Sequence, residues 1–180
     1  KAFPGCVILA AHKGEIIYHK AFGHYEYGPS PAMSAESIFD LASVTKVSAT
    51  TISVMKMYEE GLLDLNKTLG DYLPWVKGSN KEGLVIRDIL LHQAGLKAFI
   101  PFNRETIDTN RGGLPSATFY SYTKDSVYSI PVANNMFLRK DWNDTMYQRM
   151  LKSELGPVGK YIYSDNDFIF LGKIVEAIST

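Results

Sequence analysis

The stretch Phe39-Asp40-Leu41-Ala42-Ser43-Val44-Thr45-Lys46 decides the fold, because it opens a long apolar helix. Serine is a favoured N-cap residue, and the apolar residues that follow Ser43 recur at roughly helical spacing. The pattern predicts a helix that begins at Ser43 and ends at Gly61. Positions i and i+3 share one helical face, so the Lys46 amine is expected to reach the Ser43 hydroxyl.

This serine and lysine pair predicts a nucleophile and its base. A serine hydroxyl is a poor nucleophile at neutral pH, and a lysine in an apolar site can have its pKa lowered enough to take the proton. Unpaired N–H groups at the helix start favour negative charge developing on Ser43. The alternative is an ordinary capping serine with a solvated lysine, since S-x-x-K alone is a weak pattern. The uncharged run from Val47 to Met55 favours a partly buried Lys46.

Composition excludes several classes of protein. The chain has 180 residues, 46% of them apolar, which is typical of one globular domain. Lys plus Arg and Asp plus Glu number 19 each, so neither nucleic acid nor an anionic membrane is an expected partner. No apolar run is long enough for stable membrane insertion. Cys6 is the only cysteine, which excludes an internal disulfide, and we expect it to pack in a core.

The N-terminal half predicts a β-hairpin and two further short elements. Residues 6–11 and 16–23 have strand patterns and are separated by a turn at Lys13-Gly14. A short helix is expected before Pro74. The segment 84–96 begins extended and becomes helical.

Gly95 is the expected stop of that last helix. His92, close to this stop, is expected to pack at a helix end and to bond to the backbone.

The C-terminal half contains an irregular region and one more helix. Residues 99–158 carry scattered aromatic side chains, which predict either the wall of a substrate pocket or a subdomain with a small core of its own. A polar turn then leads into an apolar helix from about Phe168. Tyr163 stands before that turn, and a nearby lysine ammonium would favour its phenolate, which suits a second proton-transfer group. A tyrosine hydrogen-bonded across a loop is the alternative.

Five landmarks along the chain together resemble one known family. It is that of the serine penicillin-recognising enzymes, most closely the class C β-lactamase-like branch of β-lactamases, DD-peptidases and esterases. The landmarks occur in the family's order: Phe3-Pro4-Gly5, Phe39 to Lys46, Glu60 to Leu65, Leu90 to Leu96, and Tyr163-Ser164-Asp165 before Phe170-Leu171-Gly172.

The resemblance implies a fold and a set of roles. The fold is α/β (α+β), an antiparallel sheet flanked by helices with a helical subdomain. Ser43 corresponds to the acylated nucleophile, Lys46 to its base and Tyr163 to the tyrosine of the second motif. Asp165 stands at the substrate-binding position where the family commonly has asparagine, and a carboxylate cannot donate an amide hydrogen bond. The resemblance therefore favours an esterase or D-amino-acid peptidase over a true β-lactamase, with no metal or cofactor.

The resemblance also implies that residues 1–180 are an incomplete catalytic domain. The family's third motif, a Lys or His followed by Thr or Ser and Gly on a strand, is expected after Thr180, and that strand normally supplies an oxyanion-hole donor. We therefore expect the C-terminal strands to belong to a longer polypeptide, an expectation that the missing initial methionine favours. Two alternatives remain: a catalytically impaired β-lactamase-like binding module, and a piece that needs its partner segment to fold.

The expected setting is bacterial and periplasmic or secreted. The substrate is then a small molecule or a cell-wall-derived peptide. A weaker likeness is to the β-lactamase-like domain that follows a family 3 glycoside hydrolase in some bacterial fusion proteins.

Overall fold

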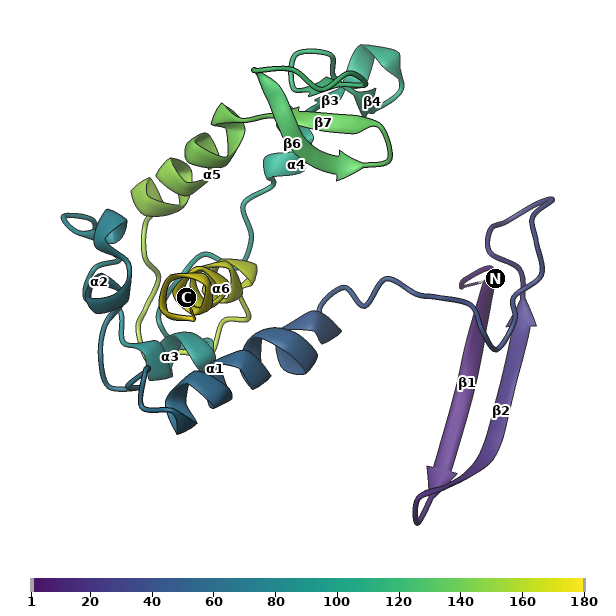
Figure 1. Ribbon diagram of the computed structural model, residues 1–180, viewed down its shortest axis with the longest axis horizontal. Helices are drawn as coiled ribbons and strands as arrows, with labels where there is room; N and C mark the ends of the chain where they lie inside the picture. The colour runs from purple at the N-terminus through teal and green to yellow at the C-terminus, as the bar shows by residue number, and fades with distance from the viewer. Residues whose placement is uncertain (1, 180) are drawn as a thin grey trace. The chain divides into compact units, whose positions relative to one another are not determined.

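The computed structural model describes residues 2–179 and divides into two compact units, Lys1–Ala42 and Ser43–Thr180. The first unit is a β-hairpin with the loop that follows it, and the second contains all the helices of the described chain (Figure 1). Strand pairing is antiparallel in both units. Within residues 2–179, no helix combines the length and the hydrophobicity that crossing a membrane requires.

The hairpin of the first unit confirms the sequence prediction. Strand β1 (Gly5–His12) pairs with β2 (Glu15–Gly23), and the turn between them places Lys13 and Gly14 at positive φ. Cys6 lies opposite Phe22 in this ladder and is only partly buried. The expectation that Cys6 packs in a core is therefore not met within this unit.

The predicted long helix is present and begins with an irregular turn. The chain is helical from Val44, as a π-helical turn η1 (Lys46–Thr50) that continues into α1 (Thr51–Glu59). The Thr51 N–H donates to the Lys46 carbonyl, and the Thr51 hydroxyl donates to the same oxygen at 2.8 Å. Such turns occur mostly as single insertions into α-helices, frequently at functional sites. Gly61, with φ of 72°, follows the helix end as predicted.

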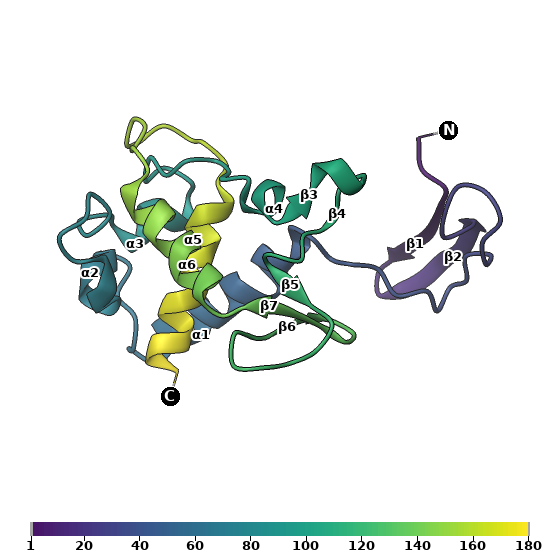
Figure 2. The ribbon, with the colours of Figure 1, turned by 90° about the horizontal axis from the view of Figure 1, so that it is seen from above.

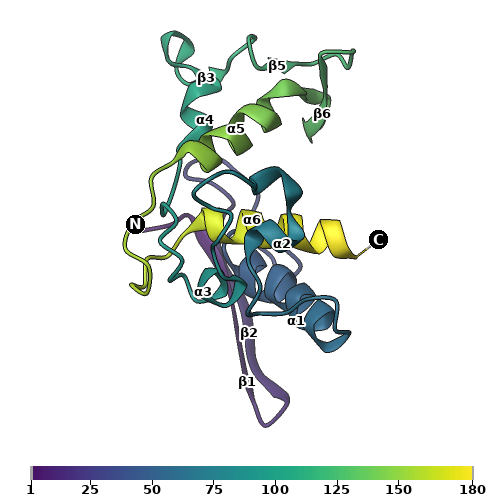
Figure 3. The same cartoon turned by 90° about the vertical axis from the view of Figure 1, so that its left-hand side faces the viewer.

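Helix α6 (Asp165–Ile178) is the centre of the second unit. It packs against α1, α2 (Leu69–Tyr72) and α3 (Ile86–Leu90), as Figures 1 and 3 show. Its apolar face supplies part of a buried core, whose fully buried members include Val54, Leu69, Val76, Ile86, Ile89, Phe170, Leu171 and Ile174. Burial of this aliphatic surface is the main force that holds these helices together.

Two helix boundaries differ from the predictions. Helix α6 begins at Asp165 and not near Phe168, because the Ser164 hydroxyl caps it by accepting from the Asp167 N–H. Helix α3 ends at Leu90, before the predicted stop at Gly95. His92 takes the left-handed conformation there, with φ of 57°.

Gly95 and Pro74 lie in the connections between these helices. Gly95, at φ of 78°, lies against the backbone of Gly156, whose N–H donates to the Gly95 carbonyl. It does not end a helix, because α3 has already ended at Leu90. The short helix α2 is followed by the 3₁₀ turn η2 (Pro74–Val76), which confirms the helix predicted before Pro74.

Residues 99–158 form small sheets, two α-helices and one 3₁₀ helix. The elements, most of them visible in Figure 2, are α4 (Phe102–Glu105), β3 (Ile107–Asp108), η3 (Thr109–Arg111), β4 (Leu114–Pro115), β5 (Tyr120–Ser121), β6 (Tyr128–Ala133), β7 (Met136–Arg139) and α5 (Asp141–Lys152). The strand order is β5-β7-β6 in the larger sheet. Leu138 and Trp142 are buried, and the Phe119 and Trp142 rings meet edge to face at 4.7 Å. These side chains form a small packed cluster within the region.

Candidate active site

The serine and lysine of the opening motif lie within reach of each other. Ser43 is exposed and stands directly before the helical segment, while Lys46 begins the π-helical turn. The Lys46 Nζ donates to the Ser43 Oγ at 3.3 Å. The residue before Ser43, Ala42, has a left-handed φ of 43°, a conformation that costs a non-glycine residue free energy.

Two residues from the start of α6 complete the cluster. Tyr163 and Asp165 flank the cap residue Ser164, and both approach the Lys46 ammonium. The Lys46 Nζ lies 2.6 Å from the Asp165 Oδ1 and 4.9 Å from the centroid of the Tyr163 ring. All four residues named from the sequence are thus together in the second unit.

The pKa of Lys46 moves in the direction opposite to the sequence expectation. The Lys46 side chain is 15% exposed, and burial by itself lowers its pKa. Burial is the largest single effect, but hydrogen bonds with Asp165 and Tyr163 and the charges of the same two residues together outweigh it and raise the pKa above its ordinary value. Lys46 is therefore an ammonium at neutral pH, and the prediction of a lowered pKa is wrong. The sequence reasoning considered the apolar helix and missed the carboxylate partner.

The pKa of Tyr163 moves in the expected direction. Hydrogen bonds with Lys46 and with Ser43 lower it, and the Lys46 charge adds to the effect, while desolvation and the Asp165 charge oppose it. The side chain is 43% exposed, so solvent screens these interactions. The phenol is the group of the cluster whose deprotonated form the site favours.

Behind Tyr163 lies a pair that the sequence reasoning did not assemble. His92 Nδ1 lies 2.6 Å from the Asp167 Oδ2, and Asp167 is 1% exposed. Burial raises the pKa of Asp167 to about 8, and it lowers the pKa of His92. The prediction that His92 packs at a helix end is confirmed, but its main partner is a side chain. A signal for Asp167 was available, because it stands three residues after a serine that caps an apolar helix.

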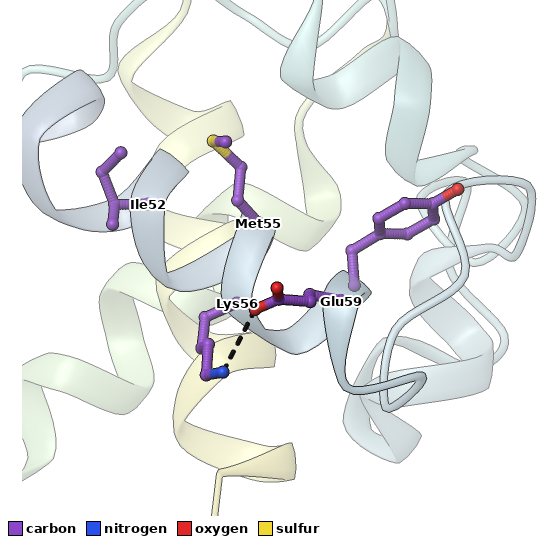
Figure 4. A pocket seen from close by; sticks show the side chains of 5 residues that line it. Ile52, Met55, Lys56 and Glu59 are labelled. Atoms are coloured by element: carbon purple, nitrogen blue, oxygen red, sulfur yellow. Dashed lines mark hydrogen bonds and ion pairs between the residues drawn. The ribbon is translucent and has the colours of Figure 1, made fainter.

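The α1 surface carries a separate hollow. It measures about 440 Å³ and is lined by Ile52, Met55, Lys56, Tyr58 and Glu59, with Lys56 and Glu59 joined by an ion pair (Figure 4). None of these five residues belongs to the Ser43 cluster.

Comparisons with known proteins give the family. The Beta-lactamase family model matches residues 1–180. An N-acetylmuramyl-L-alanine amidase of Bacillus subtilis is 28% identical over 190 residues, and a putative D-alanyl-D-alanine carboxypeptidase of Salmonella typhimurium is 28% identical over 192. Both alignments cover 98% of this chain, which spans 37% and 38% of the length of these two relatives.

A solved structure supports the same fold. The octameric penicillin-binding protein homologue from Pyrococcus abyssi superposes with a TM-score of 0.69 at 23% identity, over 98% of this chain and 35% of that one. The predicted fold class, a mixed helical and antiparallel β-lactamase-like fold, is thereby confirmed. Because the family model matches the whole chain, the protein belongs to the Beta-lactamase family.

Proposed function

We propose that the chain carries the nucleophile half of a serine hydrolase that works through an acyl-enzyme on Ser43. The observation that carries the proposal is the convergence of Ser43, Lys46 and Tyr163, with the Lys46 Nζ 3.3 Å from the Ser43 Oγ and near the Tyr163 ring. A nucleophile, a proton acceptor and a cation within hydrogen-bond reach form the usual arrangement for nucleophilic catalysis.

The pKa directions support an assignment of the proton-transfer roles. Lys46, with its raised pKa, stays protonated and stabilises negative charge on its neighbours. Tyr163, with its lowered pKa, loses its own proton more readily, so its phenolate is the form available to accept the Ser43 proton. We therefore assign the base role to Tyr163 and an electrostatic role to Lys46.

The reaction follows from these roles. The Tyr163 phenolate takes the proton of the Ser43 hydroxyl, and the Ser43 oxygen attacks the carbonyl carbon of the substrate. The bond to the leaving group breaks, and the leaving group takes the proton from Tyr163. Water then attacks the acyl ester, passes a proton to Tyr163 and releases the acid, and the proton returns to Ser43.

Asp165 bears on the substrate class. Its carboxylate is engaged by Lys46 at 2.6 Å and accepts hydrogen bonds without donating any. An ester or a D-amino-acid peptide fits this site better than an acylamide that needs an amide donor. The names of the relatives, an amidase and a carboxypeptidase, support a cell-wall-derived peptide and a periplasmic or secreted location.

Covalent labelling tests the proposal. The complete gene product is treated with a fluorophosphonate and with a fluorescent penicillin, and the modified residue is identified by mass spectrometry. We expect adduct mass on Ser43 that is lost in Ser43→Ala. Ser48→Ala is the matched control, because Ser48 is an exposed serine of the same helix whose hydroxyl donates to the Val44 carbonyl. Absence of labelling in the wild type would favour the non-catalytic binding module.

A further inference from the structure

His92 holds three consecutive residues of the segment that carries Tyr163. The His92 carbonyl accepts from the Ile162 N–H at 2.8 Å, and its Nδ1 accepts from the Ser164 N–H at 3.2 Å. Between these two contacts, the His92 and Tyr163 rings lie 4.7 Å apart at 49°. One residue therefore fixes the backbone on both sides of Tyr163 and contacts its ring.

Asp167 in turn fixes the His92 ring. The Asp167 Oδ2 lies 2.6 Å from the His92 Nδ1, the same nitrogen that faces the Ser164 N–H. Burial raises the pKa of Asp167 to about 8, so its carboxyl is protonated at neutral pH and donates to the one lone pair of Nδ1, with the imidazole hydrogen on Nε2. The longer contact from the Ser164 N–H shares that lone pair. Among residues 2–179 the other oxygen, Oδ1, has no hydrogen-bond partner, which makes an ionised Asp167 costly.

The backbone conformation of His92 indicates that this arrangement is imposed. Its φ of 57° is left-handed, a region that non-glycine residues seldom occupy. His92 as a whole residue is 9% exposed. The centroid of the Phe168 ring lies 5.3 Å from that of the His92 ring. The ring contacts and the hydrogen bonds with Asp167, Ser164 and Ile162 hold the residue there.

We propose that His92, locked by Asp167, positions the Tyr163 phenol against Ser43 and Lys46. Both are positioning residues, since neither touches Ser43. This inference rests on the proposed function for its catalytic meaning, but the geometry it assigns to Tyr163 is testable without turnover.

The groups that face His92 come from three segments. Lys46 of η1 and Asp165 of α6 act on it through their charges. Tyr161 and Tyr163, of the loop before α6, contact its ring, Tyr161 in a T-shaped pair and Tyr163 in a tilted one. Asp167 of α6 is its hydrogen-bond partner. The pH dependence of the site therefore depends on all of these groups. For that reason each disruptive variant of His92 or Asp167 must be compared with an isosteric control variant.

Two matched pairs of variants test the proposal in the complete gene product. Asn places a polar atom close to the Nδ1 position and tolerates left-handed φ, whereas Gln places it near Nε2, so His92→Asn is the conservative partner of His92→Gln. Asp167→Asn keeps a donor toward Nδ1, whereas Asp167→Leu removes the donor and the unpaired oxygen together. The leucine variant is expected to fold, since an apolar group of similar shape avoids the cost of a buried unpaired polar atom.

The first readout is the titration of Tyr163, followed by NMR of ¹³Cζ-labelled tyrosine and assigned with Tyr163→Phe. We expect the Tyr163 pKa to stay at its wild-type value in His92→Asn and Asp167→Asn. In His92→Gln and Asp167→Leu it should rise toward the ordinary value of tyrosine, because the phenol loses its contacts with Lys46 and Ser43. An unchanged titration in Asp167→Leu, the variant expected to fold, would overturn the inference even if His92→Gln does not fold.

The second readout is the rate of Ser43 labelling. The rate should fall about tenfold or more in His92→Gln and Asp167→Leu, since a positioned base contributes roughly 10²- to 10⁴-fold. In these two variants the acidic limb of the pH–rate profile should also move to higher pH. In His92→Asn and Asp167→Asn the acidic limb should stay at its wild-type pH. If the wild type is not labelled at all, the proposed function fails, while the Tyr163 titration still decides the positioning role.

Discussion

The Lys46 Nζ lies 2.6 Å from the Asp165 Oδ1. Position 165 is the one at which the family pattern commonly has an asparagine. This ion pair keeps Lys46 protonated and occupies the carboxylate that replaces the amide. In the proposed reaction it would affect both the protons and the specificity of the site.

Asp165→Asn separates these two effects. The pKa of Tyr163 should fall further, because the Asp165 charge raises it, so the acidic limb of Ser43 labelling should move to lower pH. The new amide donor should also raise kcat/KM for acylated D-Ala-D-Ala peptides by about 2- to 10-fold, the usual worth of one hydrogen bond. Asp144→Asn, at an exposed aspartate of α5, is the charge-matched control. A limb that moves to higher pH would contradict the prediction.

Replacement of Lys46 distinguishes an electrostatic role from a base role. Arginine keeps the positive charge and cannot give up its proton, while methionine keeps only the length. If Lys46 acts as a cation, Ser43 should be labelled about tenfold or more faster in Lys46→Arg than in Lys46→Met. This difference is part of the roughly 10²- to 10³-fold rate effect of one stabilising donor. Equal rates in stopped-flow labelling would return the base role to Lys46.

Asp167→Asn should change how stability depends on pH. The folded protein holds the Asp167 proton up to about pH 8, whereas the unfolded chain releases it near the ordinary value of 3.8. The contribution of the protonated form is complete below about pH 4 and is lost as the pH rises toward 8.

Because asparagine does not titrate, the Tm of Asp167→Asn minus that of the wild type should increase from pH 4 to 8 and then level off. Calorimetry at several pH values measures this difference, and Asp144→Asn corrects for the loss of one negative charge. A difference that stays constant across the window would show that Asp167 titrates normally.

Two glycines should respond to alanine with opposite signs. At Gly95, with φ of 78°, a Cβ would meet the Gly156 oxygen at 2.6 Å, so Gly95→Ala should lower stability by more than about 1 kcal/mol. Gly172 lies inside α6 with open space at the Cβ position, so Gly172→Ala should raise stability by roughly 0.5 to 1 kcal/mol. Urea unfolding of both variants gives the two values, and the same sign for both would contradict the argument.

The local features of the site were predictable, and the long-range ones were not. Ser43 directly precedes the helix and Lys46 lies in its first turn, so their spacing of three residues brings them together whatever the rest of the chain does. The ion pair of Lys46 with Asp165 joins residues 119 positions apart, and no periodicity in the sequence indicates such a contact. The sequence therefore predicted the members of the cluster, but it predicted the wrong direction for the Lys46 pKa.

The same limit applies to His92 and Asp167, which are 75 positions apart. Each has an ordinary local explanation, a histidine after a helix and an acidic residue in a first helical turn. Only the packing of α3 against α6 makes them a buried pair. The start of α6 was misplaced for a related reason, because polar residues that look like a turn are the first turn of a capped helix.

The π-helical turn at Lys46–Thr50 makes the angular position of the site depend on a single residue. An α-helix turns by about 100° per residue, so deletion of one residue within this turn would restore regular α-helix and rotate Ser43 and Lys46 by roughly that angle about the axis. Val54, on the far side of the turn, would stay in the core. Loss of one codon here would thus move Ser43 about the helix axis without unfolding the helix that follows it.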